Sequence, residues 1–275
     1  MSRSLALLPA LLLAGCAFEP GGPFATVEPS LEARYAELPG RDAGERFQRL
    51  SSDYQVKLTR AELRLDAVGL LQGAGGAASF DPASPPPGYG LCHGGHCHRD
   101  DGALVSYEEI EAELAGGAAG LTTALVLPVG ERDLLAGGRG ALSCEPACEL
   151  GLGTVRRIEA HASRLVLEGV VRDGRAEARI AETRFRLEAA LAPSAEGVIG
   201  AAIELPIDRD SPPGIRLALT LELTARLFDE VDWAALQALE AGIDLTATEN
   251  PRAFSSIVAG LGEAELRAAV ERFEK

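Results

Sequence analysis

The stretch IRLALTLELT, residues 215–224, decides the fold class, because apolar side chains alternate along it with polar or small ones. A period of two is typical of a β-strand with one buried face and one face in water. We predict that this strand extends to Leu227. Three more stretches upstream, residues 154–171, 176–191 and 198–207, are also predicted strands. The second half of the chain is therefore expected to be a β-sheet region.

The first half of the chain carries the same pattern in two places. Residues 54–71 alternate, but the phase slips once between Leu58 and Ala61, which predicts one bent strand or two short ones. Residues 121–130 are a further strand candidate. An Asp-Gly pair at 173–174 lies between two predicted strands and favours a hairpin there.

Loops and short helices complete the expected fold. Residues 73–90 and 132–151 carry turn-forming glycine and proline and predict loops. Helical spacing and capping residues predict helices over 106–117, 228–242, 251–257 and 263–273. The fold class that follows is mainly β, an antiparallel β-sandwich of the immunoglobulin-like kind, with short helices mostly at the C-terminus.

The N-terminus is typical of an exported chain. Arg3 precedes an apolar run at residues 5–13 that is too short to span a bilayer as a helix. The run ends in Leu-Ala-Gly-Cys, which resembles the lipobox of bacterial lipoprotein signal peptides. That resemblance implies a signal peptide over 1–15, lipid on Cys16 and anchorage in the cell envelope through the lipid. Ala17, by resemblance to Gram-negative sorting habits, favours the outer over the inner membrane.

The remaining chain divides into an N-terminal arm and one domain. Residues 16–53 are interpreted as the lipidated cysteine, a proline- and glycine-rich tether over 17–30, and an irregular or helical arm. Residues 54–275 are long enough for a single β-sandwich domain. The net charge is −15, which excludes nucleic acid as a partner because such a surface repels phosphates. The sequence identifies no protein partner.

Four cysteines remain after Cys16, and an even number in an exported chain indicates two disulfides. Three pairings are possible. The spacing suggests local loops, Cys92 with Cys97 and Cys144 with Cys148, but pairing across the two loops stays open.

The segment that carries chemistry is the loop at residues 89–101. It holds three of the four histidines, His93, His96 and His98. Imidazole is the commonest protein ligand for zinc and copper, and three converging nitrogens make a binding site. Gly94-Gly95 lets the backbone fold back so that the first two histidines face each other, and the third points to the same side of an extended strand. We therefore predict a copper or zinc site.

Several further residues are candidate ligands of this site. Asp100 can bind the metal or accept a hydrogen bond from a histidine ring. His161 lies in a predicted strand and becomes a fourth ligand if the fold brings it beneath the loop. Cys92 and Cys97 either form a disulfide that holds the loop or bind metal as thiolates, and an oxidising compartment favours the disulfide.

Two other interpretations of the loop are open. It can be a surface loop closed by a disulfide in a non-catalytic structural or interaction lipoprotein. Its Cys92, Cys97 and His98 also resemble a widened c-type haem attachment motif, although the spacing and the β-rich pattern disfavour haem. We find no nucleophile elbow, phosphate-binding loop or spaced carboxylate pair, so an enzyme is not expected.

Two C-terminal stretches, ALTLELTARLFDEVDWAALQAL (218–239) and NPRAFSSIVAGL (250–261), resemble periplasmic copper-binding proteins associated with methanobactin uptake. The resemblance covers about a fifth of the chain and implies a β-sandwich and copper in the periplasm. Related proteins use a modified tryptophan as a copper ligand, but the family's ligand motif is missing around Trp233. We therefore interpret Trp233 as a packing residue.

Overall fold

The computed structural model of this chain describes residues 23–73, 82, 85, 88–93, 95–99, 103–107, 110, 121–192, 197–236, 240 and 242–274. The predicted signal peptide and Cys16 lie outside these residues, as do Asp100 and most of the helix predicted at 106–117. No helix in the described ranges is long and apolar enough to cross a membrane.

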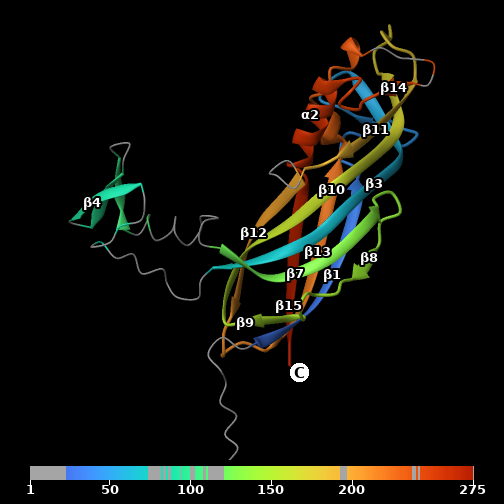
Figure 1. Ribbon diagram of the computed structural model, residues 1–275. Coiled ribbons are helices and arrows are strands. Elements are labelled where there is room, and N and C mark those ends of the chain that lie inside the picture. The colour runs from blue at the N-terminus through green and yellow to red at the C-terminus, as the bar shows by residue number, and fades with distance from the viewer. Residues whose placement is uncertain are drawn as a thin grey trace, which may run out of the picture.

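The described strands form three sheets (Figure 1). The five-stranded sheet consists of β15 (Glu265–Phe273), β13 (Gly214–Thr224), β1 (Pro23–Ala36), β8 (Arg139–Ala141) and β9 (Glu149–Gly151). The seven-stranded sheet consists of β14 (Ile243–Asp244), β11 (Thr183–Ala190), β10 (Gly153–Asp173), β3 (Tyr54–Gly73), β2 (Gln48–Arg49), β12 (Val198–Ile207) and β7 (Leu121–Asp133). The three-stranded sheet consists of β4 (Tyr89–His93), β5 (His96–Arg99) and β6 (Leu104–Ser106).

The protein is mainly β, as predicted, but its sheets are not all antiparallel. β1 runs parallel to β13, and β11 runs parallel to β14. The other pairs within the described strands are antiparallel. The expectation of a purely antiparallel arrangement is therefore wrong. The five-stranded sheet is mixed because residues 23–36 form a strand in place of the expected tether and arm.

That strand, β1, occupies residues interpreted above as tether and arm. Ala25, Val27 and Leu31 alternate toward the core and are almost completely buried. Pro29 interrupts the pattern because it cannot donate a backbone hydrogen bond, and prolines argue against an interior strand. Its carbonyl still accepts from the Leu142 amide at 2.9 Å, so the strand continues through it. A tether can therefore extend no further than residue 22.

The longest strands explain the slip in the sequence pattern. β3 is one continuous strand, and its pairing with β10 shifts register where Arg60 faces Glu168 and Leu58 faces Gly169. The extra residue is a β-bulge, which bends a strand and moves its apolar residues into a new phase. Glycine is required at 169, because a Cβ there would lie 2.4 Å from the Lys57 carbonyl oxygen. The single bent strand is confirmed.

The hairpin predicted at 173–174 joins β10 to β11, but its connection is longer than a two-residue turn. The strand expected from residue 176 begins at Thr183. Asp173 accepts hydrogen bonds from the amides of Arg175 (3.0 Å) and Arg179 (2.7 Å), which stabilise a loop in place of a tight turn. Hydrogen bonds from the Arg175 guanidinium hold the pKa of Asp173 well below its usual value.

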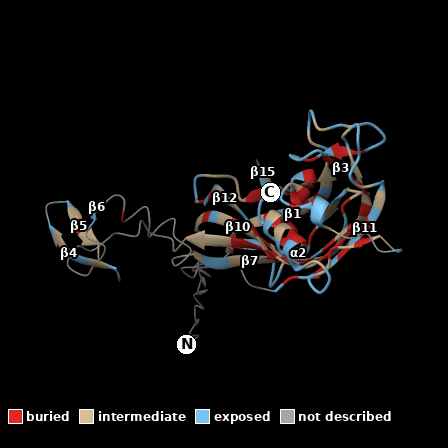
Figure 2. Ribbon diagram, turned by 90° about the horizontal axis from the view of Figure 1, so that it is seen from above, coloured by how far each residue is buried: buried red, intermediate tan, exposed pale blue. Residues whose placement is uncertain are grey.

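The core is one apolar cluster that draws residues from both large sheets (Figure 2). Trp233 is completely buried in it, with its ring centroid 5.4 Å from that of Phe185 and 6.2 Å from that of Phe228. This contact set fits the packing role expected for Trp233. We call the two large sheets and the elements packed on them the body.

The C-terminal helices are only partly as predicted. The helical elements after β13 are η3 (Ala225–Phe228), η4 (Trp233–Ala235) and α2 (Pro251–Leu261), so the helix begun at Pro251 is confirmed and extends further than expected. A regular helix over 228–242 is wrong. Val231 and Trp233 are both buried, and side chains two positions apart cannot share a face of an α-helix.

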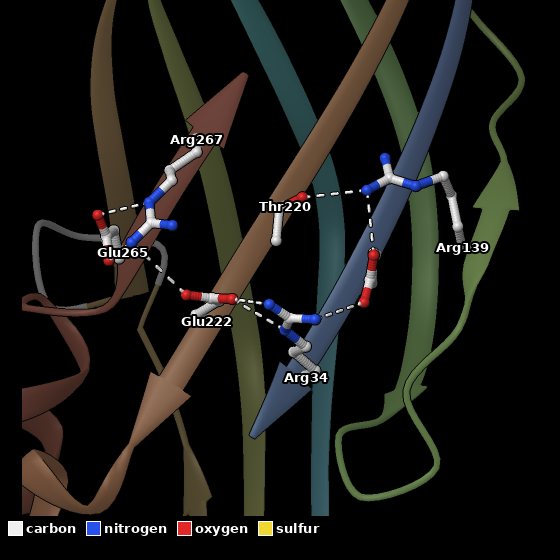
Figure 3. A network of polar contacts seen from close by, with 7 residues as sticks. Arg34, Arg139, Thr220, Glu222, Glu265 and Arg267 are labelled. Carbon is white, nitrogen blue, oxygen red and sulfur yellow. Dashed lines mark hydrogen bonds and ion pairs between the residues drawn. The ribbon is translucent and has the colours of Figure 1, made fainter. Parts of the chain in front are cut away.

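The helix expected at 263–273 is wrong, because these residues form strand β15 along the edge of β13. Leu266 is buried and the tertiary pairing overrides a helix-forming composition. Charged side chains on the outer face add support (Figure 3). Arg267 contacts Glu265 and lies 3.7 Å from Glu222, which also accepts from Arg34 Nε at 2.8 Å. Hydrogen bonding from Arg267 lowers the pKa of Glu265.

Candidate metal centre

The three clustered histidines lie on a β-hairpin formed by β4 and β5, which we call the histidine hairpin. Its register places His93 directly opposite His96, with residues 94 and 95 joining the strands. Gly95 has φ +89°, a conformation that side chains disfavour, so glycine allows this tight reversal. The predicted facing of His93 and His96 follows from this register.

His98 joins the same face because residues two apart on a strand point to the same side. Its ring centroid lies 5.4 Å from that of His93 and 5.6 Å from that of His96, while the first two rings are 4.8 Å apart. One ligand nitrogen from each of the three lies within 4.8 Å of the others. The structure therefore brings together the three histidines that the sequence singled out.

The spacing of the histidines suits a single metal ion. Nε2 of His93 and Nε2 of His98 are 3.3 Å apart. Two nitrogens at bonding distance from a tetrahedral zinc ion are themselves about 3.3 Å apart. His93 is exposed and the other two rings are half-buried, so an ion from solvent can reach this face.

The cysteines lie on the opposite face of the same hairpin. Cys92 and Cys97 are register partners and form a disulfide, and a second disulfide joins Cys144 to Cys148. The local pairing suggested by the spacing is therefore what the structure has. Alternation along the strands places the sulfurs away from the imidazoles, so the disulfide braces the hairpin and its sulfurs are not ligands in this state.

The disulfide is also part of a small apolar cluster. Cys97, Val105 and Ile110 are buried there, with Tyr89 and Tyr107 packed against them. This cluster is separate from the core of the body. The Arg99 guanidinium donates to the Tyr89 hydroxyl at 2.8 Å across the hairpin. The three-stranded sheet thus has its own supports beneath the histidine face.

The remaining candidate ligands do not join the cluster in the described residues. His161 lies in β10 of the seven-stranded sheet, opposite Ala67, with its Nε2 3.9 Å from Glu159 Oε2. The histidine cluster does not include it. Asp100 lies outside the described residues. The metal site supported by geometry is therefore a set of three nitrogens with room for further ligands.

Two exposed leucines were not singled out in the sequence. Leu104 is 62% exposed and is the register partner of His98, while Leu91 is 71% exposed two positions before His93. Leu104 lies on the histidine face, because directly paired residues point to the same side of a sheet.

The arginines that line one hollow of the body are paired with carboxylates. Arg60, Arg164 and Arg186 line a hollow of about 230 Å³ on the seven-stranded sheet, but they contact Glu168, Glu188 and Asp244 respectively. Paired charges of this kind are typical of a sheet surface and contribute little each. This hollow therefore offers no cationic site to compare with the histidine face.

No protein-family model, curated protein sequence or solved structure matches this chain.

Proposed function

We propose that this protein is an exported lipoprotein that binds one copper or zinc ion through His93, His96 and His98. The observation that carries the proposal is the convergence of three imidazole nitrogens within 4.8 Å on one face of a disulfide-braced hairpin. An all-nitrogen set suits zinc and copper(II), whereas copper(I) prefers sulfur. The soft-ligand alternative would require reduction of the Cys92–Cys97 disulfide.

The open face of the site suits a role in carrying metal. Three ligands leave at least one coordination position free, and the ring of His93 is exposed. An incoming donor or acceptor can therefore bind the ion before the protein releases it. Sequestration, sensing and delivery all use such a site, and delivery makes most use of an open position.

The remaining parts of the proposal concern location and architecture. The Leu-Ala-Gly-Cys motif ending at Cys16 supports lipid anchorage in the envelope, and Ala17 supports the outer membrane. Shared burial of residues from both large sheets in one cluster supports a sandwich of those sheets. The immunoglobulin-like variant would need revision to include the parallel strand β1.

A non-catalytic interaction module is the second candidate. The observation in its favour is the exposure of Leu104 on the histidine face and of Leu91 in the same hairpin, since exposed apolar groups mark contact surfaces. Attachment of haem would use the two sulfur atoms that the disulfide joins, and this disfavours the haem alternative.

Elemental analysis of the chain from residue 17 onward, purified from periplasm without chelator, tests the metal site. We expect one equivalent of copper or zinc, and its loss when His93, His96 and His98 are all replaced by alanine. His161→Ala is the matched control and should keep the metal. Failure of the wild type to load from added copper or zinc, or full retention by the triple variant, would leave only the interaction module.

A further inference from the structure

The start of β1 fixes where a lipid anchor would hold the body. β1 begins at Pro23, whose Cα partner is Gly151 in β9. Seven residue steps separate Cys16 from Pro23, and an extended chain of that length spans at most about 25 Å. A lipid on Cys16 therefore keeps Gly151 and its surroundings close to the bilayer surface.

The histidine hairpin is inserted into the body at the same place. The segment of residues 74–120, which we call the histidine insertion, leaves from Gly73 and returns at Leu121, and these two residues are Cα partners. Gly73 is also the partner of Thr154 at the start of β10. The end of β3 and the start of β7, which flank the insertion, are therefore paired with each other and lie beside Thr154, three residues after Gly151.

A side-chain contact ties these two features together. The amide Nε2 of Gln72, one residue before the insertion, donates to the carbonyl oxygen of Gly151 at 3.2 Å. The residue that pairs with the first residue of β1 therefore also contacts the base of the histidine insertion. The segments that lead to the lipid anchor and to the metal site therefore both begin at the same end of the sheets.

The register of the neighbouring strands shows which other residues lie at this end of the body. Gly153 pairs with Ile207, Thr26 pairs with Gly214, and Gly214 pairs with Phe273. Figure 1 shows β9 and the C-terminus at this end, while α2 lies toward the other. Leu152 lies in the turn between β9 and β10 and is 43% exposed, which suits contact with the interface of a membrane.

We propose that this end of the body faces the lipid surface, so that the protein takes up and releases its metal next to the membrane. The proposal rests on the lipid anchor and the metal site proposed above. The opposite end, beyond Asp173, points away from the bilayer. The partner assigned to this end is the lipid surface itself.

Energy transfer to labelled lipid tests the orientation. The full lipidated chain is reconstituted in phosphatidylcholine vesicles that contain a headgroup acceptor dye, with a donor dye on Leu152→Cys or on Ala178→Cys. These two exposed positions flank the ends of β10, whose 21 residues span about 65 Å. We expect transfer from position 152 to exceed that from position 178 by about threefold or more, given this separation.

Equal transfer from both positions, or stronger transfer from 178, would overturn the proposed orientation. A Gly/Ser linker inserted before Pro23 is the control, and it should reduce transfer from position 152. A chain that does not float with the vesicles would show instead that the lipid anchor proposed above is absent.

Copper(II) provides a second measurement on the same vesicles. One equivalent bound to the hairpin should quench a headgroup fluorophore, and the variant with His93, His96 and His98 replaced by alanine should not. If elemental analysis finds the ion bound to the floated protein but no quenching occurs, the metal site works away from the bilayer and the proposal is wrong. If no ion is bound, the metal function itself fails.

Discussion

The body and the histidine hairpin are stabilised in different ways. The body buries long alternating strands in a single apolar cluster, whereas among the described residues the cluster at the three-stranded sheet buries Cys97, Val105 and Ile110. A sheet of that size has too little core to be stable in water without a cross-link. The comparison teaches that burial supports the scaffold, while a covalent bond supports the part proposed to bind metal.

The largest expected effect is the loss of body stability when a cavity is made in its core. Trp233→Ala removes a fully buried ring and should lower the free energy of unfolding by about 4 kcal/mol. Metal affinity of the hairpin should stay within a factor of two at temperatures where the body is folded, because the two clusters share no residue. Urea unfolding and copper titration measure the two quantities. A parallel fall in both would show that the regions are coupled.

Removal of the hairpin disulfide should weaken metal binding and leave the stability of the body unchanged. Replacement of Cys92 and Cys97 by serine frees the strands that hold the histidines, at a cost of about 2 kcal/mol, or roughly thirtyfold in zinc affinity. Replacement of Cys144 and Cys148 by serine is the matched control and should lower body stability without changing zinc affinity. Unchanged zinc affinity in the first variant would mean that the disulfide does not organise the site.

Two glycines allow a finer comparison of the regions. Gly95 in the hairpin and Gly130 in β7 both have positive φ, and a Cβ at either would meet no atom within 4 Å. Alanine at each position therefore introduces backbone strain alone, about 1 kcal/mol. We expect Gly95→Ala to weaken zinc binding about fivefold, and Gly130→Ala to lower only the unfolding free energy of the body.

The smallest effect is a dependence of body stability on acid. Hydrogen bonds from Arg175 lower the pKa of Asp173 in the folded state. The resulting stabilisation is present above the unfolded pKa of about 4 and is lost as pH falls toward the folded pKa. Asp173→Asn should therefore lower the melting temperature at pH 7 and reduce its fall between pH 5 and pH 3. The zinc affinity of this variant at pH 7 should equal that of the wild type.

The sequence predicted the parts of the molecule whose pattern is local. Alternation identified β3, β12 and β13, and the slip near Leu58 left one bent strand or two short ones, of which the structure has the single strand with a bulge. The histidine spacing around a glycine pair identified the cluster, because a two-residue reversal fixes which side chains face each other.

The sequence pattern did not predict which segments pair with strands that are distant in sequence. β15 has a helix-forming composition and becomes a strand because the edge of β13 offers it partners. β1 contains Pro29 and follows a proline-rich segment, so only its place beside β13 makes it a strand. Exposure of Leu91 and Leu104 likewise depends on what covers the hairpin, which no local pattern contains.

The parallel pairing of β1 with β13 has a consequence for how the chain acquires its structure. Arg34 and Glu222, which are bonded across these strands, are 188 positions apart in sequence. A pairing of such separation requires closure of a very long loop and forms slowly. The five-stranded sheet cannot be completed until nearly the whole chain is available, so the parallel pairing of β1 with β13 forms late in synthesis. A chain built in this way stays incompletely folded until its last strands are available, which would suit the proposed export across a membrane.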